Sequence, residues 1–153
     1  MSANSSSKVR TLGKVLFILY IGFILYFLLI TDWYGRTGDS NGYQYNLELF
    51  REIRRFWNYR RIVGYNVMFA NIFGNVIIFI PFGFFLPMAS KHRSFLITIF
   101  YSFSLSFIVE IFQLITMVGS FDVDDLLLNT LGGICGYVLF ILLYRKIDLK
   151  EKN

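Results

Sequence analysis

Residues 94–118 read SFLITIFYSFSLSFIVEIFQLITMV, and this stretch decides the fold class. It holds one charged side chain, Glu110, and it exceeds the roughly 20 residues that an α-helix needs to cross a bilayer. The whole chain has a matching composition: 56% of its residues are hydrophobic, 16% are charged, and its mean hydropathy is +0.55. Soluble domains carry about 25% charged residues. The sequence therefore predicts a membrane protein.

Three further apolar runs accompany this one, at Val15–Ile30, Val67–Met88 and Asp125–Tyr144. We expect an all-α integral membrane protein with four transmembrane helices. The first run is expected to be retained rather than cleaved as a signal peptide, because the bulky residues after it offer no small-residue cleavage site. The expected parts are an N-terminal tail at 1–14, a first span at 15–30, an extracellular loop at 31–66, a core of three spans at 67–144 and a tail at 145–153.

The long loop contains an amphipathic segment, residues 47–57, with the sequence LELFREIRRFW. Its apolar side chains recur at helical spacing, and its arginines lie off that face. One interpretation is a helix that lies on the membrane surface. The other is a short helix packed on the protein itself.

The distribution of basic residues predicts the orientation, because Lys and Arg are enriched in cytoplasmic segments. With both termini inside, nine basic residues fall on the cytoplasmic side and six, all Arg, fall outside. We therefore expect a multi-pass protein of the bacterial cell membrane with both termini in the cytoplasm.

Polar side chains inside the last three runs mark a candidate site, because such residues are costly in a bilayer. They occur in pairs at helical spacing, and all are expected near the outer end of their spans. Three helices would then direct polar groups into one outward-facing pocket that binds an anionic head group, a metal ion or an amine. The expected ligand-binding residues are Asn71, Asn75, Glu110, Gln113, Asp122, Asp124, Asp125 and Asn129. The arginines expected to cover the pocket and contact head groups are Arg51, Arg54, Arg55, Arg60 and Arg61.

Structural explanations compete with this one. Asn and Gln in spans often hydrogen-bond neighbouring helices, and the three aspartates near residue 124 are also typical of a solvated turn and a helix cap. Gly132 and Gly136 form a G-x-x-x-G pair, which we expect to serve packing within the bundle rather than dimerisation. No His or Cys spacing typical of a metal site is present, so we expect no cofactor, no metal and no nucleic-acid partner.

Several motifs in the core resemble one known family. The elements are N-x-x-G-N at Asn71–Asn75, P-x-G at Pro81–Gly83, E-x-x-Q at Glu110–Gln113, F-D-x-D-D at Phe121–Asp125 and N-T-x-G-G at Asn129–Gly133. Their order and spacing resemble those of VanZ-like membrane proteins. Many relatives have an Arg just before F-D-x-D-D, where this chain has Gly119-Ser120. The resemblance implies a bacterial cell-membrane protein, and the family's namesake is associated with low-level resistance to lipoglycopeptides such as teicoplanin.

Three functions remain open. The first is a non-enzymatic envelope protein that binds membrane lipids, a lipid-linked cell-wall precursor or the lipoglycopeptide, and so lowers susceptibility to the drug. The second is a membrane-embedded enzyme acting on a lipid head group, with Glu110, Asp124 or Asp125 as candidate catalytic carboxylates. The third is a small transporter or a subunit of a complex. We favour the first, because the sequence contains neither a recognisable nucleophile nor a standard metal site.

Overall fold

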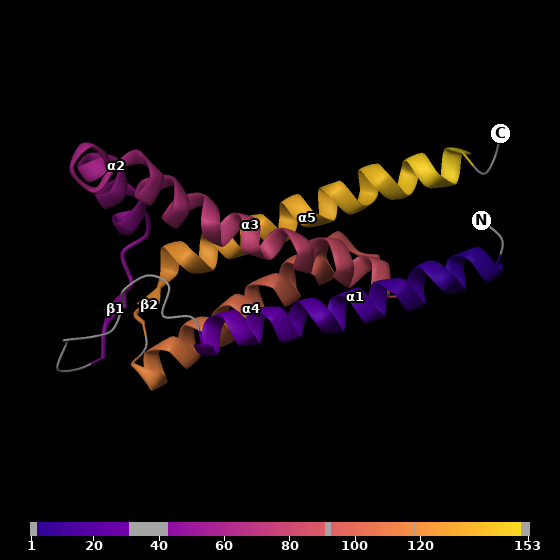
Figure 1. The fold of residues 1–153 in the computed structure, drawn as a ribbon, viewed down its shortest axis with the longest axis horizontal. Coiled ribbons are helices and arrows are strands. Elements are labelled where there is room, and N and C mark those ends of the chain that lie inside the picture. Colours follow the sequence, from indigo (N-terminus) through magenta and orange to yellow (C-terminus); the bar gives the residue numbers. More distant parts are fainter. Residues whose placement is uncertain (1–2, 31–42, 91–92, 118, 151–153) are drawn as a thin grey trace.

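The computed structural model describes residues 3–30, 43–90, 93–117 and 119–150. These residues form five helices and a two-stranded sheet (Figure 1). In chain order the elements are α1 (Ala3–Ile30), β1 (Tyr45–Asn46), α2 (Arg51–Val63), α3 (Tyr65–Ala89), α4 (Phe95–Thr116), β2 (Phe121–Asp122) and α5 (Val123–Lys150). The expected loop residues 31–42 and the last three residues of the expected tail lie outside the described residues.

Three of the described helices are long and apolar enough to cross a membrane: α3, α4 and the Val123–Tyr144 part of α5. Most of each apolar window is exposed on the surface of the bundle, which is the arrangement that a lipid environment favours. The predicted helical membrane core is thus confirmed, and its three spans lie within a few residues of their expected bounds. Among the described residues α1 does not belong to these three candidates.

Glycines allow α3 and α5 to pack at very short range. A Cβ atom added at Gly132 would lie 2.2 Å from the carbonyl oxygen of Val76, and one at Gly136 would lie 2.0 Å from that of Ile80. Gly83 on α3 meets α5 in the same way, at the carbonyl group of Gly133. Such distances leave no room for any side chain. The expected packing of the G-x-x-x-G pair within the bundle is confirmed.

Helix α1 packs along α3. It runs without a break from Ala3 to Ile30, so it includes residues of both the expected tail and the expected first span. The Tyr20 hydroxyl donates a hydrogen bond to the Ile78 carbonyl oxygen, and the Ile24 side chain is fully buried in the same cluster. The first helix therefore contributes to the core of the described bundle rather than lying apart from it.

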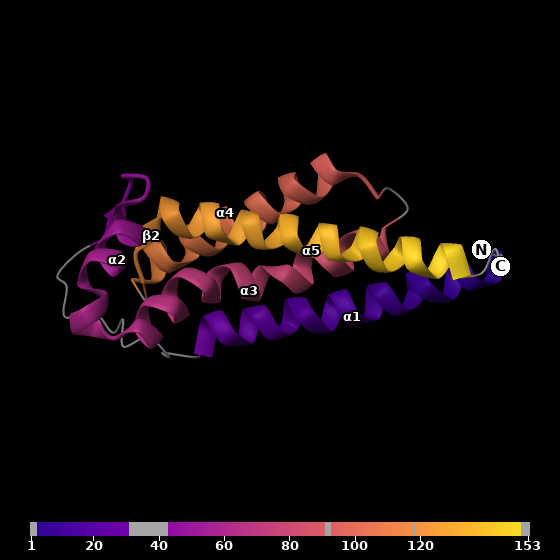
Figure 2. The same ribbon diagram turned by 90° about the horizontal axis from the view of Figure 1, so that it is seen from above.

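Helix α2 lies across the end of the bundle at which α3 and α5 begin (Figures 1 and 2). It covers residues 51–63, so it begins and ends later in the chain than the amphipathic segment that the sequence suggested. Before it, β1 pairs in parallel with β2, with Tyr45 opposite Phe121 and Asn46 opposite Asp122. This short sheet was not predicted, and it joins the segment before α2 to the segment before α5.

Candidate functional site

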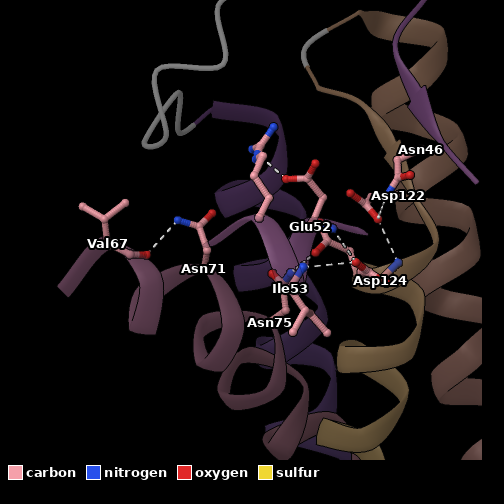
Figure 3. Close-up of polar contacts among 10 residues, drawn as sticks. Asn46, Glu52, Ile53, Val67, Asn71, Asn75, Asp122 and Asp124 are labelled. Carbon is pink, nitrogen blue, oxygen red and sulfur yellow. Dashed lines mark hydrogen bonds and ion pairs between the residues drawn. The ribbon is translucent and has the colours of Figure 1, made fainter. Parts of the chain in front are cut away.

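Polar residues from four segments meet where α2 crosses the bundle. We call them the polar cluster: Asn46, Asn75, Glu110, Asp122, Asp124 and Asp125. Four of its members, Asn46, Glu110, Asp122 and Asp124, are less than a tenth exposed. Figure 3 labels four members of the cluster: Asn46 on β1, Asn75 on α3, Asp122 on β2 and Asp124 at the start of α5. Buried polar groups are stable only when they are hydrogen-bonded, so the partners of each carboxylate define what the cluster does.

Asp124 caps the first turn of α2. Its carboxylate accepts hydrogen bonds from the backbone N–H groups of Phe50, Glu52 and Ile53, at 2.9 Å for Glu52 and 3.3 Å for Ile53 (Figure 3). The residue at the N-cap position, Phe50, has a left-handed backbone and provides no side-chain acceptor. The first N–H groups of a helix have no partner within the helix, and their dipoles favour a negative charge. Asp124, fully buried on α5, supplies that charge.

Asp122 links three segments. Its carboxylate accepts a hydrogen bond from the Asn46 amide at 3.1 Å and from the backbone N–H of Asp124 at 2.8 Å. Its own backbone N–H donates to the carboxylate of Glu110 at 2.8 Å. The Asn46 amide oxygen in turn accepts from the backbone N–H of Glu48 at 3.1 Å. The end of α4, the start of α5 and the segment before α2 are therefore joined by one chain of hydrogen bonds.

Two further bonds hold α5 to its neighbours. The Asn75 amide on α3 donates to the Asp125 carboxylate, and the Asn129 amide donates to the Ser106 hydroxyl of α4 at 2.9 Å. Asn75, Asp125 and Asn129 all belong to the pairs of polar residues at helical spacing that the sequence shows in its apolar runs.

Comparison with known proteins decides the family. The VanZ/LLP1 family model matches residues 17–144, which is most of the chain. The chain belongs to the VanZ/LLP1 family. It is also similar to Protein VanZ of Enterococcus faecium, with 30% identity over 142 residues that cover 93% of this chain and 81% of that protein. No solved structure matches it.

The VanZ/LLP1 motifs occupy definite places in this fold. N-x-x-G-N and P-x-G lie on α3, E-x-x-Q lies on α4, and F-D-x-D-D covers β2 and the first turn of α5. Just before F-D-x-D-D, Gly119 packs on Gln113: a Cβ added there would lie 3.3 Å from the Cβ of Gln113. The short segment before β2 therefore follows the surface of α4 closely in this chain.

Only some of the expected ligand-binding residues lie together in the polar cluster. Asn71 donates to the Val67 carbonyl oxygen of its own helix at 2.9 Å (Figure 3), so this amide serves its own backbone. Asn129 bonds Ser106 rather than a member of the polar cluster. Buried oxygens without a hydrogen-bond partner within the described chain occur on the side chains of Ser102, Gln113 and Asn129.

The loop arginines are engaged mainly with α2 and the residues just before it. Arg54 pairs with Glu48 at 2.9 Å, and Arg55 pairs with Glu52 at 2.6 Å. Arg60 donates to the Trp57 carbonyl oxygen, and its guanidinium lies 4.8 Å from the centre of the Trp57 ring. The ion pairs of Arg54 and Arg55 are thus formed on the surface, with glutamates rather than with the buried aspartates.

Sequence reasoning missed Asn46 and Ser106. Ser106 belongs to a row on α4, spaced by four residues, of Thr98, Ser102, Ser106 and Glu110, all of them buried. That periodicity was visible and indicates a polar face directed at another helix. Asn46 offered no such signal, because it lies in an irregular segment before α2. No group of three or more His, Cys, Asp or Glu residues in the described ranges could hold a metal ion.

Proposed function

We propose that this VanZ/LLP1-family membrane protein lowers the susceptibility of the bacterial envelope to lipoglycopeptides such as teicoplanin. In this proposal the polar cluster faces outward and binds a lipid-linked or head-group ligand, which reduces access of the drug to its site of action. One observation carries it: the buried carboxylate of Asp124, on α5, accepts hydrogen bonds directly from the backbone of the arginine-rich helix α2. A charged helix fixed over a polar cluster is suited to recognise groups at the membrane surface.

The proposal includes α1 as a fourth span, with both termini in the cytoplasm. Tyr20 and Ile24 pack into the bundle beside α3, at the level of Ile78 and Phe82 on that span. Helix α1 begins and α5 ends at the same end of the bundle, opposite α2 (Figure 1). Alkaline phosphatase fused after Asn153 should be inactive, since that enzyme requires an oxidising compartment. An active fusion would contradict the orientation.

The resistance effect is tested by expression in a susceptible Gram-positive host. The expected result is a higher inhibitory concentration of teicoplanin with little change for vancomycin. Glu110→Ala should abolish this shift, because it removes the acceptor of the Asp122 N–H within the polar cluster. Ser104→Ala is the matched control on the same helix, since that hydroxyl bonds only the Phe100 carbonyl of its own helix. A wild-type protein without a selective teicoplanin shift, or an unchanged shift in Glu110→Ala, contradicts the proposal.

A further inference from the structure

Helix α2 has one covered side and one wide exposed side. Ile53, Phe56 and Arg60 are half-buried and share one side of the helix. The exposed arc runs from Trp57, at the edge of the covered side and 57% exposed, to Ile62, which lies opposite that side and is 81% exposed. Exposed apolar residues of this size beside arginines are typical of a helix at a lipid–water interface.

The arginines of this arc fall into two classes. Arg54 and Arg55 have carboxylate partners, Glu48 and Glu52. Arg51 and Arg61 are also exposed, and no ion pair, hydrogen bond or ring contact engages their guanidinium groups within the described part of the chain. Two arginines are therefore free to accept an external anion, at opposite ends of α2.

We propose that the exposed arc of α2 is a binding surface for anionic phospholipid head groups, with Arg51 and Arg61 as the phosphate ligands and Asp124 as the positioning residue. Arginine binds phosphate oxygens through several N–H donors at once. Trp57 and Ile62 enter the boundary between head groups and acyl chains. A soluble polyanion would offer these two apolar side chains no such environment. The inference deepens the proposed function by naming a partner, and it rests on the same placement of α2 at the outer membrane surface.

Fluorescence quenching tests the proposal on the full-length protein in vesicles. In a Trp33→Phe background Trp57 is the sole tryptophan, and brominated lipids quench it only when they lie next to it. Titrating brominated phosphatidylglycerol against phosphatidylcholine gives the relative binding constant of the anionic lipid at α2. We expect this constant to exceed one clearly, and Arg51→Gln with Arg61→Gln to lower it by up to about fivefold per arginine.

Arg54→Gln with Arg55→Gln is the matched control, because it removes the same total charge from the same helix. This pair should retain most of the preference, since exposed ion-paired arginines are already partly neutralised. Equal losses in the two double variants would overturn the assignment to Arg51 and Arg61. A relative constant near one, or no quenching by either lipid, would overturn the lipid surface itself.

Asp124→Ala separates positioning from direct binding. It should reduce quenching by both lipids together, because α2 is released, whereas the Arg51/Arg61 variant should change only the preference between them. Asp124→Asn should restore part of the quenching, since an amide oxygen still caps the helix. Unchanged quenching in Asp124→Ala would remove Asp124 from the proposal. A lipid preference without any teicoplanin shift would refute the proposed function alone, and the reverse result would refute this inference alone.

Discussion

The middle and the start of α5 are held to the rest of the protein by different means. In the middle of the helix, Gly132 and Gly136 let its backbone meet the backbone of α3, and this contact has no room for another atom. At the end below α2, Asp122, Asp124 and Asp125 join α5 to three other segments through specific hydrogen bonds. Two apolar helices can associate through close backbone packing without any polar group. An irregular segment such as the one before α2 needs hydrogen bonds to acquire a defined position.

The strongest test of this contrast is Gly132→Val. The added atoms would collide with the Val76 carbonyl group, so α3 and α5 would have to separate along their whole contact. We expect the free energy of unfolding in detergent to fall by about 3 kcal/mol or more, measured by thermal or denaturant unfolding. Gly22→Ala is the control, because no atom of another described segment lies within 4 Å of the added Cβ. If both variants unfolded alike, the close contact would not be what holds the bundle.

The next largest effect is expected from Asp124→Ala. The loss leaves three backbone N–H groups of α2 without their acceptor, and we expect a loss of about 2 kcal/mol. Unlike Gly132→Val, this change should act locally. Limited proteolysis should cut α2 many times faster while the transmembrane helices remain protected. Cleavage that accelerated equally throughout the chain would contradict a local role.

A pair of serines one turn apart on α4 gives the smallest and most sharply matched comparison. Ser106→Ala removes the acceptor of the buried Asn129 amide, so we expect a loss of about 1 kcal/mol. Ser102→Ala removes a buried hydroxyl that has no partner in the described structure, so we expect a change within about 0.5 kcal/mol. Equal destabilisation by the two variants would show that Ser102 is engaged as fully as Ser106.

The sequence predicted the parts of the protein in which apolar or small residues recur at helical spacing. The spans around Val76 and Glu110 followed from apolar length, and the packing role of Gly132 and Gly136 followed from helical spacing. Helical spacing did not reveal that Asn71 bonds its own backbone, because it places a side chain on a face without fixing its partner.

The contacts at the end of the bundle could not be predicted in the same way. Asp124 was expected as a ligand-binding or catalytic residue, or as part of a solvated turn and a helix cap. The helix that it caps is α2, more than 70 residues earlier in the chain. The pairing of β1 with β2 is equally distant in sequence. Neither contact leaves a periodic signature, since both depend on how an irregular segment folds back onto the membrane helices.

The central claim is that α2 is held on the bundle by Asp124, and amide hydrogen exchange at the first turn of α2 tests it most directly. The N–H groups of Phe50, Glu52 and Ile53 have no acceptor within α2, so an uncapped first turn should exchange rapidly. The structure predicts slow exchange at these amides in the wild-type protein and fast exchange in Asp124→Ala, with α4 unchanged. Rapid exchange in the wild type, or equal rates in both proteins, would contradict it.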